Sequence, residues 1–326
     1  MLNKIMGIKS LNRYFMENCS KRSIHKRHLR EFSNKTVVVD TSIYLYKFSA
    51  EGSLIENMYL MISIFKKYRI EPIFIFDGKP PNEKKNLLMR RRMEKKEAQD
   101  KYTELKNVLD NDKIDEDQRQ QILLDMDSLK RQFVRIKECD IINTKNLMDA
   151  YGVSYYDALG EADVLCCYLV KTGRAWACVS DDMDMFVYGC DRVIRHLSML
   201  NHTVIFYDTD SILNDINMTE DLFRDIMVLS GTDYNMNNET NLIETLKWYN
   251  QYNKTASHDT TKFYEWLLKN TRYIKDINGL MNVKRMFELE TYDEILKSIQ
   301  IKDNKNKNID NNVLKDLLSH EGFIFV

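Results

Sequence analysis

Short runs of β-branched and aromatic residues alternate along the chain with longer amphipathic stretches. Six runs predict strands, at 36–40, 72–77, 153–156, 175–180, 193–196 and 203–207. Helical patterns separate most of them, at 53–68, 83–135, 143–151 and 161–172. Apolar strands separated by helices are typical of a parallel sheet covered on both faces. We therefore expect an α/β protein with a mainly parallel, twisted sheet flanked by helices.

The stretch 83–135 differs from the rest of this pattern. It is long, highly charged and poor in Gly and Pro, and it predicts two helices with a break near 110–117. Residues 79–101 carry nine Lys or Arg against four acids, whereas 110–127 carry seven acids against two bases. Without further information, a solvated helical hairpin is the simplest interpretation of this segment.

The pattern becomes helical again in the last third of the chain. Helices are predicted at 222–229, 242–252, 263–269, 283–287 and 313–318. Residues 301–312 are rich in Asn and Lys and predict a loop. With three Pro and ten Gly in the whole chain, there is little room for a flexible linker.

Composition narrows the class of protein. A hydrophobic content of 44% over 326 residues fits a folded globular protein. The net charge is −1, so a nucleic-acid partner would require positive charge to be concentrated locally. Six Cys show neither a CxxC pair nor zinc-type spacing, which predicts reduced thiols in an intracellular protein of the nucleus or cytoplasm. No apolar run reaches the ~18 residues of a membrane span, and we expect no membrane association.

Acidic residues gather at the ends of predicted strands. Asp40 closes the run VVVD, Asp77 closes FIFD, and Asp182 and Asp184 follow AWACVS. Ligands of open α/β sheets bind at the carboxyl ends of strands, so these four acids should converge on one edge. In an extended backbone Asp182 and Asp184 share one face, and Asp181 is then expected to point away.

Three further acids can complete this cluster. Glu161 and Asp163 open a predicted helix, whose positive end tolerates carboxylates, and Asp233 follows a later helix. Seven clustered carboxylates cannot all stay ionised without a counter-charge. Oxygen ligands select magnesium or manganese. Two such ions about 3.5–4 Å apart can hold the attacking and leaving oxygens of a displacement at phosphorus.

Five blocks of sequence resemble the flap endonuclease family of structure-specific 5′ nucleases. They are MGIKSL at 6–11, VVVDTSIYLYKF at 37–48, FIFDGKPPNEKK at 74–85, GEADVLCCYLVKTGRAWACVSDDMDMFVYG at 160–189 and LSGTDYN at 229–235. The resemblance runs from Met6 to about Tyr234. It implies a PIN-like nuclease core in two parts, 6–82 and 136–234, interrupted by a helical arch at 83–135. A helical DNA-binding region with a degenerate helix-hairpin-helix follows at 235–326.

The resemblance also implies roles for individual residues. Its metal carboxylates correspond to Asp40, Asp77, Glu161, Asp163, Asp182, Asp184 and Asp233. Lys84 and Arg91 match a basic pair that acts on the scissile phosphate. Seven residues apart on a helix, they would share one face. Gly7, Tyr46 and Arg90 are implied substrate contacts. Tyr46 matches an aromatic that stacks on a base, worth about 1–3 kcal/mol, although a core tyrosine fits the sequence equally well.

The activity implied is hydrolysis of branched or flapped DNA near a 5′ end by a monomer that holds two magnesium ions, which manganese can replace. A junction resolvase, a 5′ exonuclease or an RNA endonuclease could use the same core. An inactive nucleic-acid-binding scaffold is the alternative from another class. The Asn-, Lys- and Ile-rich composition favours a large DNA virus or an AT-rich microbe as the source.

The sequence departs from the family pattern at several points. Asp163 stands where the family more often has Glu, and five residues precede Met6. The segment 235–241 lacks the Gly-rich turn of the family's helix-hairpin-helix, so we expect side chains to grip the duplex there. No C-terminal sliding-clamp peptide is recognisable, and recruitment by a clamp is not expected.

Overall fold

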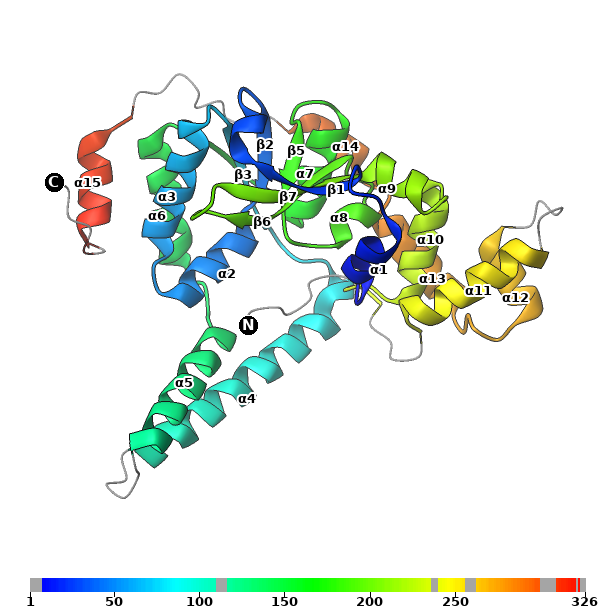
Figure 1. The fold of residues 1–326 in the computed structure, drawn as a ribbon, viewed down its shortest axis with the longest axis horizontal. Helices are drawn as coiled ribbons and strands as arrows, with labels where there is room; N and C mark the ends of the chain where they lie inside the picture. The colour runs from blue at the N-terminus through cyan, green and yellow to red at the C-terminus, as the bar shows by residue number, and fades with distance from the viewer. Residues whose placement is uncertain are drawn as a thin grey trace.

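A seven-stranded sheet forms the centre of the molecule (Figure 1), with strand order β1-β7-β6-β5-β2-β3-β4. The computed structural model describes residues 8–109, 116–235, 240–255, 262–299, 309–320 and 322. The strands are β1 Ile24–His28, β2 Thr36–Asp40, β3 Glu71–Phe76, β4 Ser154–Asp157, β5 Ala177–Val179, β6 Arg192–Ser198 and β7 Thr203–Asp208. Strands β6, β5, β2, β3 and β4 are mutually parallel, whereas β7 and β1 add antiparallel pairs. The predicted mainly parallel α/β sheet is confirmed.

Helices cover both faces of this sheet and form two hydrophobic cores. Along β2, Val38 points into one core, whereas Val37 and Val39 point into the other, as the alternation of a strand requires. The first core is covered by α1 Leu11–Asn18, α7 Ala162–Lys171, α8 Asp184–Val187, α9 Thr209–Asp215 and α10 Glu220–Ser230. The second is covered by α2 Thr41–Glu51, α3 Leu54–Lys67, α6 Glu138–Tyr151 and α15 Asn311–His320.

Two long helices, α4 Lys85–Leu109 and α5 Glu116–Gln132, lie side by side and project away from the sheet (Figure 1). Their buried hydrophobic side chains are those of Leu87, Ala98 and Met126, and none of the three belongs to either core. The two helices predicted for 83–135 are present, and most of the predicted break lies outside the described residues.

The C-terminal helices are divided between the two cores. Helices α11 Leu242–Thr255, α12 Phe263–Asn270, α13 Ile277–Met286 and α14 Asp293–Ser298 contribute side chains to the first core. Helix α15 instead lies against α6, where the Asp310 amide donates to the Ala150 carbonyl at 2.8 Å. None of the described helices combines the length and apolar composition needed to cross a membrane.

Candidate active site

The first three acids of the predicted cluster lie at the ends of three adjacent strands. Strands β5, β2 and β3 are neighbours and parallel, so their carboxyl ends meet at one edge. Asp40 is the last residue of β2, Asp77 follows β3 directly, and Asp182 follows β5 after a short loop. The Ser180 hydroxyl donates to Asp40 Oδ2 at 3.1 Å and ties the ends of β5 and β2 together.

The start of helix α7 adds two more acids at the same edge. Glu161 is the N-cap of α7, and Asp163 lies in its first turn. The Ala162 amide donates to Asp77 Oδ1 at 2.8 Å, which fixes the beginning of α7 against the end of β3. The Ser42 hydroxyl, in the first turn of α2, donates to Asp77 Oδ2 at 2.5 Å. Three separate segments are thus joined through one carboxylate.

Of the remaining two acids, Asp184 is placed differently from the prediction, whereas Asp233 follows a helix as predicted. An extended backbone was expected to place Asp182 and Asp184 on one face, but Asp184 is the first residue of the short helix α8. Its amide donates to Asp182 Oδ1 at 2.9 Å, because the chain turns between the two residues. Asp181 does point away, since its Oδ1 accepts from the His196 amide at 2.7 Å on β6. Asp233 lies in the loop after α10.

Electrostatics show that these carboxylates form one neighbourhood. Asp40, Asp163, Asp182 and Asp184 are each at most 9% exposed. Burial raises the pKa of all four, and in each case the next largest cause is repulsion from another acid of the predicted set. Asp233, for example, raises the pKa of both Asp182 and Asp184. Neutralisation or an added cation would relieve this repulsion.

Two basic side chains reach the cluster from the foot of the projecting helices. Lys84 Nζ contacts Glu161 Oε2, and both side chains are 12% exposed. Burial lowers the pKa of Lys84, but Glu161, Asp163 and Asp184 raise it by more, so the ammonium group stays protonated. Arg91 Nη2 donates to Asp233 Oδ2 at 3.0 Å. The two predicted basic residues therefore lie together at the acids.

The donor set fits hard divalent cations. Within the described residues, no group of three His, Cys, Asp or Glu side chains has the geometry of a formed metal site. Carboxylates that repel one another, two of them engaged by Lys84 and Arg91, would be expected to stay apart until a cation binds. The buried Asp184 Oδ1 has no hydrogen-bond partner, so one oxygen is already desolvated and available. An all-oxygen set of this kind suits magnesium or manganese.

The predicted substrate contacts have different surroundings. Tyr46 on α2 is 47% exposed, which rules out the alternative of a core tyrosine, and Lys95 Nζ lies 4.7 Å from its ring centroid. Arg90 points to Glu94, with Nε 3.6 Å from Oε1, rather than to the acids. Gly7 and the central part of the 235–241 turn lie outside the described residues.

Sequence reasoning missed several residues that touch the cluster, namely Tyr234 and the two serines Ser42 and Ser180 described above. The Tyr234 hydroxyl donates to Glu161 Oε2 at 2.6 Å. The Lys84 ammonium also lies 5.0 Å from the centroid of the Tyr234 ring. The position of Tyr234 directly after Asp233 was the available signal, but nothing in the local sequence pattern indicates a contact with Glu161.

Comparisons with known proteins agree with this arrangement. Residues 6–98 match the XPG N-terminal domain, and residues 152–233 match the XPG I-region. The chain is 30% identical over 250 residues to flap endonuclease 1 of Aedes aegypti and 27% identical over 248 residues to that of Glycine max. Each match covers 70% of this chain and 62% of the relative, so the chain spans about three fifths of these relatives' length.

Two solved structures illustrate the similarity of fold. The catalytic core of Rad2 in complex with DNA substrate has a TM-score of 0.62 at 19% identity, covering 95% of both chains. Flap endonuclease-1 from Methanococcus jannaschii has a TM-score of 0.55 at 20% identity, covering 91% of this chain and 98% of that one. At these identities the similarity establishes the fold.

Proposed function

The chain belongs to the flap endonuclease family, and we propose that it is a structure-specific 5′ nuclease that hydrolyses DNA near the 5′ end of a flapped or branched strand. The observation that carries this proposal is the meeting of carboxylates from β2, β3, β5, α7, α8 and the loop after α10. Four of these carboxylates, those of Asp40, Asp163, Asp182 and Asp184, are buried, and buried like charges would only destabilise the fold unless a cation binds them. A passive binding scaffold gives no reason for such an arrangement.

The seven carboxylates would hold two magnesium ions, which manganese can replace. The members are Asp40, Asp77, Glu161, Asp163, Asp182, Asp184 and Asp233. When bound, the ions supply Lewis-acid stabilisation of the charge that develops at the scissile phosphate. The burial of Asp40, Asp163, Asp182 and Asp184 would strengthen the electrostatic interactions between these ions and their ligands.

Lys84 and Arg91 are the residues we assign to the phosphate itself. Both are cations beside the acids, and Lys84 is held protonated by its neighbours. A fixed positive donor lowers the barrier when it contacts the oxygen on which charge develops. Because the ammonium group of Lys84 keeps its proton, it would act as a donor and not as a base.

The substrate strand would be gripped by the arch, residues 83–135, and by Tyr46. The basic first half of the arch provides phosphate contacts, and the exposed Tyr46 ring provides a surface on which a base can stack. We retain the proposed division into a core of 6–82 and 136–234 and a helical region of 235–326 that contacts duplex DNA. The active form would be a monomer.

Cleavage of a 5′-flap duplex with magnesium and with EDTA tests the proposal. Wild type and Asp182→Ala should be compared, with DNA binding measured in parallel. We expect metal-dependent cleavage by the wild type, and binding without cleavage by the variant. A wild type that binds but never cuts in magnesium or manganese would be a scaffold. Equal cleavage of RNA or of unbranched single strands would remove the flap assignment.

A further inference from the structure

A chain of hydrogen bonds leads from the first core to the predicted metal cluster. The hydroxyl groups of Tyr188 and Tyr234 are 2.6 Å apart, and the Tyr234 hydroxyl is 2.6 Å from Glu161 Oε2. The same Oε2 atom contacts Lys84 Nζ. The contacts therefore form one series, from Tyr188 after α8 to Tyr234 after α10, then to Glu161 at the start of α7 and Lys84 at the foot of the arch.

The direction of these hydrogen bonds follows from the groups involved. An ionised carboxylate can only accept, so Tyr234 donates to Glu161 and its oxygen is left to accept from Tyr188. Burial raises the pKa of both tyrosines well above its ordinary value, so both hydroxyls remain donors. Hydrogen bonds aligned in this way strengthen one another in a low-dielectric interior.

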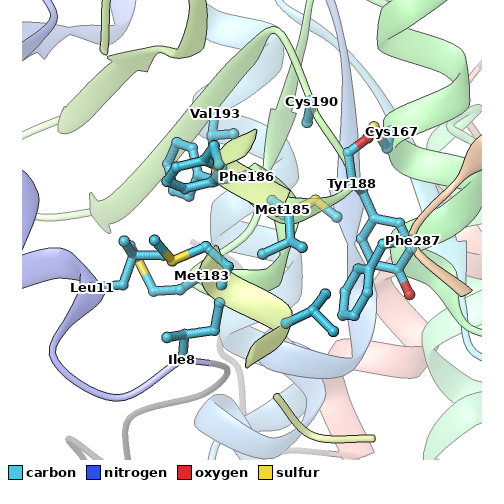
Figure 2. Packing of buried hydrophobic residues seen from close by; sticks show 14 of the residues in the cluster. Ile8, Leu11, Cys167, Met183, Met185, Phe186, Tyr188, Cys190, Val193 and Phe287 are labelled. Atoms are coloured by element: carbon cyan, nitrogen blue, oxygen red, sulfur yellow. Dashed lines mark hydrogen bonds between the residues drawn. The ribbon is translucent and has the colours of Figure 1, made fainter. Parts of the chain in front are cut away.

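The two tyrosines are held by the C-terminal helices. Phe287, which follows α13, is fully buried, and its ring centroid lies 4.7 Å from that of Tyr188 and 5.2 Å from that of Tyr234. Figure 2 shows the Tyr188 and Phe287 rings against each other, at the side of the core where Met185 also packs. The Tyr234 ring, in turn, has the Lys84 ammonium 5.0 Å from its centroid. Tyr234 therefore touches both members of the Glu161–Lys84 pair.

We propose that Tyr234 and Tyr188 are positioning residues for the Glu161–Lys84 pair. The inference rests on the proposed nuclease function. Both described donors to Glu161 contact Oε2, so neither of them occupies Oε1, which would remain available to a divalent cation. Lys84 is held between a carboxylate and an aromatic ring, which limits its rotamers and prepares its ammonium group for a phosphate.

Conservative variants can separate positioning from packing. Tyr234→Phe and Tyr188→Phe keep the rings and remove only the hydroxyls. Tyr264→Phe is a matched control, because Tyr264 is also buried and donates to the Asp225 carbonyl at 2.6 Å, outside the acid cluster. Each variant should be assayed for the single-turnover rate on a 5′ flap, for the DNA dissociation constant and for thermal stability.

We expect Tyr234→Phe to lower the single-turnover rate about ten- to hundredfold, as for loss of a hydrogen bond to a charged group. The DNA dissociation constant should stay within about twofold, because little substrate contact is lost. Tyr188→Phe should lower the rate less, and should have no additional effect in the Tyr234→Phe background. Unchanged rates, additive losses in the double variant, or an equal loss in Tyr264→Phe would overturn the inference.

A second readout does not depend on cleavage. With ¹³C at the ζ position of tyrosine, NMR should show the Tyr234 resonance shift when magnesium is added, and shift again in Tyr188→Phe. A wild type that cuts no branched DNA would overturn the proposed function. The positioning inference would still be supported if magnesium moved the Tyr234 resonance, and overturned if it did not.

Discussion

Replacing Asp184 with Asn should stabilise the metal-free protein while weakening its response to magnesium. Asp184 is 2% exposed, and its buried Oδ1 has no hydrogen-bond partner. Burial, followed by repulsion from Asp182 and Asp233, raises its pKa well above the ordinary value. The substitution keeps the shape of the side chain and removes the charge that the folded state tolerates poorly.

The size of the effect follows from removing the charge of a desolvated acceptor, since Asn keeps an uncharged oxygen at this position. An unsatisfied buried acceptor costs about 1–3 kcal/mol, and more when it is charged. At about 2 °C per kcal/mol for a large domain, the metal-free Asp184→Asn protein should melt about 2–6 °C above the wild type. Because the raised pKa makes the folded state bind a proton more readily than the unfolded state, wild-type stability should increase as pH falls through the folded-state pKa. This increase should be smaller in Asp184→Asn.

Thermal melts in EDTA and in magnesium measure both parts of this prediction. Magnesium at 100 times its dissociation constant should stabilise the wild type by about 2.7 kcal/mol, and Asp184→Asn by clearly less. Asp157→Asn is the control for the substitution itself, because Asp157 is an exposed aspartate at the end of β4 whose Oδ1 lies 2.6 Å from Lys145 Nζ. That variant should lose up to about 1 kcal/mol. A metal-free Asp184→Asn protein less stable than the wild type, with an unchanged magnesium response, would refute the reasoning.

Three further predictions concern the substrate side of the site. Lys84→Ala and Arg91→Ala should each lower the single-turnover rate on the order of 10²–10³-fold with nearly unchanged DNA binding. Arg90→Ala should change the rate little. Unchanged rates in all three variants would mean that Lys84 and Arg91 are ordinary surface charges. Tyr46→Ala should weaken flap binding by about 1–3 kcal/mol and Tyr46→Phe should not, as measured by fluorescence anisotropy. Replacing 85–132 with a short Gly-Ser linker should leave the melting temperature of the core nearly unchanged but strongly reduce flap cleavage, and a collapse in stability would contradict the small burial of this segment.

Much of the fold and most of the cluster could be predicted because the relevant signals are local. An apolar run followed by an acid identifies both a strand and its end, and parallel pairing then brings Asp40, Asp77 and Asp182 together. Strand β1 was missed because its sequence, IHKRH, is basic and only partly buried at the sheet edge. This pattern is typical of an edge strand, whose charged residues discourage pairing with other chains, and not of a buried strand.

The contact between Tyr234 and Glu161 could not be predicted for a different reason. It joins residues far apart in the sequence and depends on how Phe287 fills the space behind both rings. Packing of this kind is decided by the shapes of several elements together, and no periodicity in one segment records it. The turn between Asp182 and Asp184 was also missed. An extended backbone and the start of a short helix both bring these two acids close together, so the sequence does not distinguish them.

The small burial of α4 and α5 has a consequence for how the molecule responds to heat and to ligands. With three buried hydrophobic side chains and no share in either core, the pair depends largely on its own helical propensity. Its backbone amides should exchange with deuterium long before those of the sheet. Under the proposed function, a substrate strand bound against these two helices would be expected to slow this exchange, so that the low local stability of the pair would make its order respond to the substrate.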